Sequence, residues 1–247
     1  EVVSDPDMKL EIREKDKKPL ERFRQKLRPK YHFTAPEGWI NDPNGLIYFN
    51  GEYHMFYQHN PCENKWGNMH WGHATSKDMI HYKEEEIALR PDFLGAVYSG
   101  SAIVDYDNVS GLKENENDPI ILFYTAAGFR FNQCIAYSTD KGKTFKRYDK
   151  NPIIPFVTFW NRDPKVIKCE ELDCYVMAVF LQDEDNNFIL YRYPTANRFY
   201  NEDMIDSAFQ ALINVNTLIE ESLNLSNRAK VVIRKVEDEI SVSKTIE

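Results

Sequence analysis

The pattern Trp-x-x-Asp-Pro occurs twice in this sequence, at residues 39–43 and 160–164. Each copy leads into a run of apolar residues that predicts a β-strand. A proline disfavours the helical region for the residue before it, so Asp42 is expected to be extended at a strand entrance. A single Asp-Pro often only marks a turn. The second copy, which contains Asp163, favours instead a repeated structural unit.

The residues around the two copies divide into three units with a similar order of predicted strands. Asn50-Gly51, between the apolar runs 46–49 and 53–57, is a strong short signal for a β-hairpin. The pattern Ala-x-Ser-x-Asp recurs at residues 74–78 and 136–140. The units extend from residue 41 to about 89, from 97 to about 148, and onward from 161.

Four antiparallel strands in each repeated unit predict an all-β fold, a β-propeller of which about three blades are recognisable. A β-sandwich also contains many short strands, but the two repeated patterns favour the propeller. The innermost strands of a propeller line its central channel, so Asp42 and Asp163 are expected to converge on one axial pocket. Paired carboxylates are the groups that carry out glycoside hydrolysis.

Composition excludes several classes of partner. The formal net charge of −8 argues against nucleic acid, and no apolar run is long enough to span a membrane. The histidines and cysteines show no metal-ligand spacing, so the sequence predicts no metal site and no cofactor. The first residues lack a basic segment followed by an apolar one, so no signal peptide is expected in this chain, and the compartment is left open.

The two ends of the chain differ from the strand-rich middle. Residues 1–29 are predicted to form a charged extension, residues 30–198 the propeller region, and residues 199–247 a tail. From residue 201 apolar residues recur at helical spacing, which predicts an amphipathic helix, and a strand-like run follows at Val231, Val232 and Ile233. A closed propeller has about four to eight blades. Three blades are too few to close such a ring, which leaves three alternatives: further blades are missing here, the tail closes the structure, or the chain forms a homo-oligomer.

Five motifs in order make the sequence resemble glycoside hydrolase family 32, the invertase, levanase and inulinase group. The resemblance covers roughly residues 28–193 and ends after the third unit. The motifs are WINDPNG at residues 39–45, FYQHNP at 56–61, WGNMHWGHA at 66–74, YSGSA at 98–102 and RDPKV at 162–166.

The resemblance implies a five-bladed propeller and a glycosidase that releases terminal β-D-fructofuranosyl units, with retention, from sucrose, inulin or levan. By position, Asp42 resembles the nucleophile and Asp163 the transition-state stabiliser. The residues that resemble those gripping the fructosyl unit are Asn41, Gln58, Trp66, Tyr98, Ser99 and Arg162. Arg162 is expected to keep the neighbouring carboxylates ionised. The family's Glu-Cys-Pro motif, which carries the general acid, does not occur here, so no general acid is assigned.

Three other functions remain open from the sequence. The chain is a non-catalytic fructoside-binding propeller if the general acid is truly missing. It is a related propeller glycosidase if it cleaves arabinosides or xylosides, although the full WINDPNG motif disfavours this. It is a partner-binding fragment if it folds only with another chain.

Overall fold

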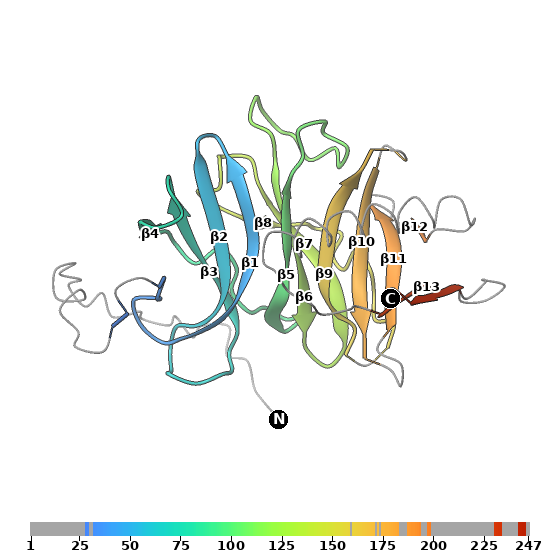
Figure 1. Cartoon of the computed structure of the whole chain (residues 1–247), viewed down its shortest axis with the longest axis horizontal. Helices are drawn as coiled ribbons and strands as arrows, with labels where there is room; N and C mark the ends of the chain where they lie inside the picture. Colours follow the sequence, from blue (N-terminus) through green and yellow to red (C-terminus); the bar gives the residue numbers. More distant parts are fainter. Residues whose placement is uncertain are drawn as a thin grey trace.

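A computed structural model describes residues 28–29, 32–158, 160–170, 172, 174–182, 187–193, 197–198, 230–233 and 242–245. Within these residues the regular structure consists of β-strands alone, arranged in three four-stranded antiparallel sheets and one two-stranded sheet. Figure 1 shows the three larger sheets following one another across the molecule. Among the described residues, no helix is long and apolar enough to cross a membrane.

Each larger sheet is one blade, and its strands pair in the order in which they occur in the chain. Blade 1 contains β1 (Trp39–Phe49), β2 (Glu52–Asn60), β3 (His70–Ser76) and β4 (Tyr82–Glu84). Blade 2 contains β5 (Ala96–Val104), β6 (Ile120–Ala127), β7 (Phe131–Ser138) and β8 (Lys146–Arg147). Blade 3 contains β9 (Arg162–Cys169), β10 (Cys174–Leu181), β11 (Asn187–Tyr193) and β12 (Asn197–Arg198). The first strands of the blades, β1, β5 and β9, are neighbours.

The predicted all-β fold with three recognisable blades is therefore confirmed. The strand-like run at residues 231–233 is also confirmed, because it lies in β13 (Lys230–Ile233), which pairs with β14 (Val242–Thr245). The amphipathic helix predicted from residue 201 lies outside the described residues, as does the charged extension except for residues 28 and 29. The three-part division of the chain stays a prediction.

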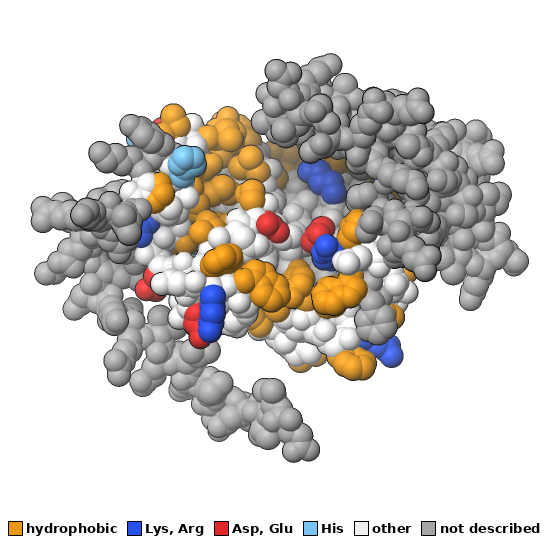
Figure 2. Space-filling model, turned by 60° about the horizontal axis from the view of Figure 1, so that its bottom comes forward, with side chains coloured by type: hydrophobic (Ala, Val, Ile, Leu, Met, Phe, Trp, Pro, Cys, Tyr) orange, Lys and Arg blue, Asp and Glu red, His pale blue; other side chains and the backbone are white. Residues whose placement is uncertain are grey.

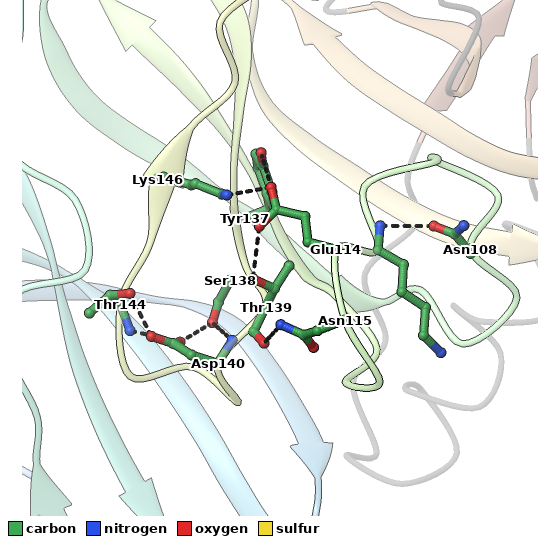
Figure 3. Close-up of polar contacts among 10 residues, drawn as sticks. Asn108, Glu114, Asn115, Tyr137, Ser138, Thr139, Asp140, Thr144 and Lys146 are labelled. Carbon is green, nitrogen blue, oxygen red and sulfur yellow. Dashed lines mark hydrogen bonds and ion pairs between the residues drawn. The ribbon is translucent and has the colours of Figure 1, made fainter.

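The predicted turns form as their residue types require. Asn50 and Gly51 join β1 to β2 with φ angles of 52° and 86°, the left-handed backbone that a two-residue hairpin turn needs. In the first repeated Ser-x-Asp turn, Ser76 Oγ donates a hydrogen bond to Asp78 Oδ1 over 3.1 Å. In the second, Ser138 Oγ donates to Asp140 Oδ1 over 2.7 Å, as Figure 3 shows. The two matching turns therefore join the third strand to the fourth in the same way in blade 1 and in blade 2.

The core lies between the blades, and the middle strand β6 contributes to both of its halves. Successive side chains of a strand point to opposite faces of the sheet. Ile120 and Leu122 accordingly pack with Phe56 and Trp71 of blade 1. Ile121 and Phe123 pack with Met177 and other apolar residues of blade 3. Because both faces of β6 are buried, its apolar run is unbroken. The packing on its two faces fixes the spacing between the blades.

A pair of buried histidines lies between blades 1 and 2. His54 Nδ1 and His73 Nε2 are 3.0 Å apart, and the two side chains are 4% and 2% exposed. The His73 ring also stacks on Phe56, with 4.4 Å between ring centroids. Burial lowers the pKa of His73 to about 3 and lowers that of His54. Nearby charges shift the two pKa values in opposite directions: Glu52 and Glu85 raise that of His54, whereas Lys83 lowers that of His73.

We expect this pair to make the protein less stable in mild acid. As the pH falls below about 6.5, the unfolded chain gains protons that the folded histidines do not bind. The free energy of unfolding should therefore fall by up to about 1.4 kcal/mol per pH unit for each histidine. Urea denaturation at several pH values between about 7 and 5 measures this slope, which should become shallower in the double variant His54→Leu/His73→Leu.

The matched control is His32→Leu, because the side chain of His32 is exposed. It should keep the slope of the wild-type protein. A double variant with the same slope as the wild type would contradict a role for the buried pair.

Candidate active site

Three β-bulges lie at matching places in the inner strands of the three blades. The pairing of β1 with β2 shifts between Ile40 and Pro43, a step that contains Asp42. The pairing of β5 with β6 shifts between Tyr98 and Gly100, a step that contains Ser99. The pairing of β9 with β10 shifts in the step that contains Asp163. Bulges redirect side chains and are common beside active sites, and here each redirects a polar residue.

The bulges bring Asp42, Ser99 and Asp163 together from separate blades. Ser99 Oγ donates a hydrogen bond of 2.7 Å to Asp42 Oδ2. The charge of Asp42 raises the pKa of Asp163, so the two carboxylates lie within electrostatic reach of each other. The sequence placed Asp42 at a strand entrance, whereas the structure places it inside β1, because the strand begins at Trp39 and continues through the bulge.

A second contact ties β1 to β5 beside this cluster. The backbone N–H of Gly100 donates to Asn44 Oδ1 over 3.2 Å, and Asn44 is 3% exposed. The position of Asp42 relative to Ser99 is thus set by backbone and side-chain bonds on both sides of the bulge.

The electrostatics of Asp163 differ from the sequence-based expectation. The Asp163 side chain is 45% exposed, yet desolvation by the protein atoms around it raises its pKa; the Arg162 guanidinium lowers this pKa, and Asp42 raises it further. Arg162 Nε lies 3.4 Å from Asp163 Oδ2, and the guanidinium also lies 4.7 Å from the ring centre of Phe180. Arg162 was expected to keep the neighbouring carboxylates ionised. In the structure it acts in that direction on Asp163, but the desolvation that comes with burial outweighs it.

The two copies of the Asp-Pro pattern also differ in backbone conformation. Asp163 has a φ of 59° and Trp160 a φ of 65°, both in the left-handed region, whereas Asp42 lies outside it. A residue that has a Cβ rarely adopts this backbone region, and a proline after it favours extended backbone instead. The second aspartate is therefore held in a strained conformation.

A row of aromatic side chains lies along the cluster. The rings of Trp66 and Tyr98 are 6.0 Å apart, those of Tyr98 and Phe131 5.5 Å, and those of Phe131 and Trp160 5.1 Å. Trp66 is 57% exposed and Trp160 52%, so the row is open to a ligand. Figure 2 shows acidic and basic side chains close together near the middle of one face, with hydrophobic side chains beside them.

Sequence reasoning selected Trp66 and Tyr98 from this row but missed Phe131 and Trp160. Trp160 opens the second Trp-x-x-Asp-Pro copy, and this repetition was the signal that could have identified it. Phe131 carries no such signal, because only the folded chain brings β7 next to residue 160.

Asn41 and Gln58, two further predicted contacts of the fructosyl unit, are engaged with the protein. Trp39 Nε1 donates to Asn41 Oδ1 over 2.9 Å. Gln58 is 3% exposed, and its amide nitrogen donates to the Val97 carbonyl over 2.9 Å. The Gln58 bond joins blade 1 to blade 2, so this side chain also positions the strand that carries Ser99.

Some buried hydrogen-bond donors near the cluster have no partner among the residues that the structure describes. They are Arg162 Nη1 and the side-chain amide nitrogens of Asn44 and Asn161. Buried polar groups are nearly always hydrogen-bonded, so such donors are suited to a ligand rich in hydroxyl groups. The described residues contain no group of His, Cys, Asp and Glu that could hold a metal ion.

Replacing Arg162 with glutamine should shift the acid limb of the pH profile to higher pH. The variant loses the positive charge that lowers the pKa of Asp163, while burial and Asp42 continue to raise it. Asp163 then binds a proton at a higher pH, and any activity that needs its carboxylate is lost earlier as the pH falls. The measurement is kcat/KM between about pH 4 and pH 8, with the substrate that the sequence resemblance predicts.

Arg162→Lys serves as the charge-preserving control and should restore the acid limb at least in part. An Arg162→Gln profile that superimposes on the wild-type profile would show that Asp163 does not govern this limb.

Comparisons with known proteins identify the family. The pattern of the glycosyl hydrolases family 32 N-terminal domain matches residues 32–224. A levanase of Bacillus subtilis (strain 168) is 44% identical over 164 residues, which are 65% of this chain and 24% of the levanase. An invertase of Schizosaccharomyces pombe is 46% identical over 162 residues, which are 62% of this chain and 28% of the invertase.

Solved structures give the same result. A β-fructofuranosidase of Schwanniomyces occidentalis, solved with fructosyl-erythritol, superimposes with a TM-score of 0.59 and 40% identity over 62% of this chain and 31% of that one. An exo-inulinase of Aspergillus awamori gives a TM-score of 0.56 and 34% identity over 65% and 38% of the two chains. These relatives confirm the five-bladed propeller class predicted from the sequence, and this chain spans between 24% and 38% of their length. The chain belongs to glycosyl hydrolase family 32.

Proposed function

We propose that this site binds the terminal β-D-fructofuranosyl unit of sucrose or a fructan and supports its hydrolysis with retention. The observation that carries the proposal is the meeting of Asp42 and Asp163 at bulges of separate blades, with Ser99 and Arg162 as their partners. The family relatives named as levanase and invertase support the same substrate class.

In this mechanism Asp42 is the nucleophile. Its carboxylate attacks the anomeric carbon of the fructosyl unit while the bond to the leaving oxygen breaks, giving a covalent fructosyl ester and an alkoxide; a carboxylic acid must give this oxygen a proton for the alcohol to leave. Water then attacks the anomeric carbon and breaks the ester bond, which releases fructose, a proton and the free Asp42 carboxylate. Ser99 Oγ donates its hydrogen bond to one oxygen of Asp42, which orients the other oxygen.

Asp163 is the transition-state stabiliser in this mechanism. Its carboxylate accepts hydrogen bonds from sugar hydroxyls, and these strengthen as positive charge develops on the ring. Arg162 holds this carboxylate and has a buried N–H left for the ligand. The exposed rings of Trp66 and Trp160 provide apolar surface against which sugar faces can lie.

A specific observation keeps a second function in view, namely fructoside binding without catalysis. Departure of an alkoxide needs a carboxylic acid about 5–5.5 Å from the nucleophile in a retaining enzyme. The Glu-Cys-Pro motif, which the resemblance associates with this acid, does not occur in the sequence.

One assay separates the two functions. The full chain is incubated with sucrose, inulin and levan, and with p-nitrophenyl β-D-fructofuranoside, whose leaving group departs as a stable anion without an acid. Release of fructose from the natural substrates supports the complete hydrolase. Release of nitrophenolate alone supports a working nucleophile without an acid.

Binding of sucrose by calorimetry, with no release from any substrate, supports the binding protein. A chain that neither binds nor cleaves fructosides, but cleaves an aryl arabinoside or xyloside, would overturn the proposed substrate class.

A further inference from the structure

A chain of buried hydrogen bonds runs from blade 2 to the backbone of Asp163. Thr125 on β6 and Gln133 on β7 are directly opposite in the strand pairing. The Asp163 N–H donates to Thr125 Oγ1 over 3.2 Å, and Thr125 Oγ1 donates to Gln133 Oε1 over 2.9 Å. Gln133 Nε2 in turn donates to the Asn161 carbonyl over 3.1 Å. The side chains of Thr125 and Gln133 are 0% exposed.

These hydrogen bonds hold both ends of the bulged segment 161–163 at the start of β9. Asn161 and Asp163 are two residues apart, and blade 2 contacts the carbonyl of the first and the N–H of the second. Between these anchors the backbone reaches the left-handed φ of 59° at Asp163. Such strain persists only where the surroundings over-determine the conformation, and it concentrates at functional sites.

Neither residue has a contact of its own with Asp42 or with the Asp163 carboxylate in the described structure. Their side chains can therefore influence the position of the Asp163 carboxylate only through the backbone of residues 161–163. The two other bulge residues, Asp42 and Ser99, lie outside the left-handed region. Blade 1 also holds the backbone on both sides of Ser99, since Trp71 Nε1 donates to the Tyr98 carbonyl over 3.0 Å and the Gly100 N–H donates to Asn44 Oδ1 over 3.2 Å.

We propose that Thr125 and Gln133 are positioning residues that hold the Asp163 carboxylate toward Asp42 and the sugar. The expected change in kcat rests on the proposed function, but the expected displacement of the Asp163 carboxylate does not. The hydroxyl of Thr125 is the central element, because it serves as acceptor for Asp163 and donor to Gln133 at once.

The test uses the isosteric variant Thr125→Val in the full chain. Valine fills the same space but leaves the Asp163 N–H and Gln133 Oε1 without their partner. The backbone of residues 161–163 then relaxes and displaces the Asp163 carboxylate. A displacement of about 1 Å at a reacting group lowers the rate on the order of 100-fold. We expect kcat for p-nitrophenyl β-D-fructofuranoside to fall about 10- to 100-fold with little change in KM. Thr125→Ser keeps the hydroxyl and should restore kcat.

A carboxyl ¹³C NMR titration tests the geometry independently of any activity. The Asp163 signal is assigned with Asp163→Asn, and its midpoint is followed in the wild type and in Thr125→Val. Burial, Arg162 and Asp42 all act on this carboxyl in the folded protein, so a displaced side chain should titrate at a different pH. Thr75→Val is the matched control, because Thr75 is equally a buried strand threonine, bonded to Glu85 over 2.8 Å on blade 1.

The outcomes separate this inference from the proposed function. A shifted Asp163 titration in Thr125→Val, absent from Thr75→Val and reversed in Thr125→Ser, supports the positioning role even if the wild type cleaves no fructoside. An unchanged titration and an unchanged kcat overturn it, whatever the wild type does. A wild type without fructoside binding or cleavage, but with the shifted titration, overturns the proposed function alone.

Discussion

Replacing Asp42 with asparagine should abolish cleavage of p-nitrophenyl β-D-fructofuranoside. The amide has nearly the shape of the carboxylate and can still accept the Ser99 hydrogen bond, so the bulge in β1 should persist. An amide oxygen is a far weaker nucleophile and forms no stable fructosyl ester. We expect kcat to fall by about 10⁴-fold or more, the scale seen when a hydrolase loses its covalent nucleophile.

The assay compares initial rates of nitrophenolate release, with sucrose binding measured in parallel. Binding should remain, because the substitution removes a charge but keeps the shape of the side chain and its bond from Ser99. Asp107→Asn is the matched control, since Asp107 is an exposed aspartate in an ion pair with Lys168 and should tolerate the same substitution. Residual activity of Asp42→Asn close to the wild-type level would remove Asp42 from the role of nucleophile.

The meeting of Asp42 and Asp163 was predictable because it depends on repetition. When one short pattern opens two blades, the inner strands of a propeller carry both copies to the same axis. The Asn50-Gly51 hairpin was predictable for a different reason, since its left-handed backbone is a local property of these two residue types. Each of these predictions needed only the order of strands or a few adjacent residues.

The conformation of Asp163 was beyond sequence reasoning. Pro164 alone predicts extended backbone, yet the structure has a φ of 59°. The groups that hold it, Thr125 and Gln133, lie about 30 to 40 residues earlier in the chain and belong to another blade. The balance between Arg162 and burial at Asp163 was likewise hidden, because desolvation is fixed only when the blades pack.

Replacing Gly100 with alanine should cause the largest loss of stability of the substitutions considered. A Cβ at Gly100 would lie 1.9 Å from the Phe123 carbonyl oxygen and 2.9 Å from its carbon. Backbone atoms cannot rotate away as a flexible side chain can, so β5 and β6 would have to separate. We expect the free energy of unfolding to fall by about 3 kcal/mol or more, at the upper end of overpacking effects. Urea denaturation measures it as a lower midpoint.

Gly51→Ala is the control that isolates the steric effect. A Cβ at Gly51 meets no atom within 4 Å, so its cost comes from the φ of 86° alone, about 1–2 kcal/mol. Equal midpoints for the two variants would contradict the close approach of β5 to β6. The larger effect at Gly100 should also reach the site, because its N–H bonds Asn44 and the preceding residue, Ser99, bonds Asp42. Stability and fructoside binding should therefore decline together in Gly100→Ala, whereas Gly51→Ala should lose stability and keep its affinity.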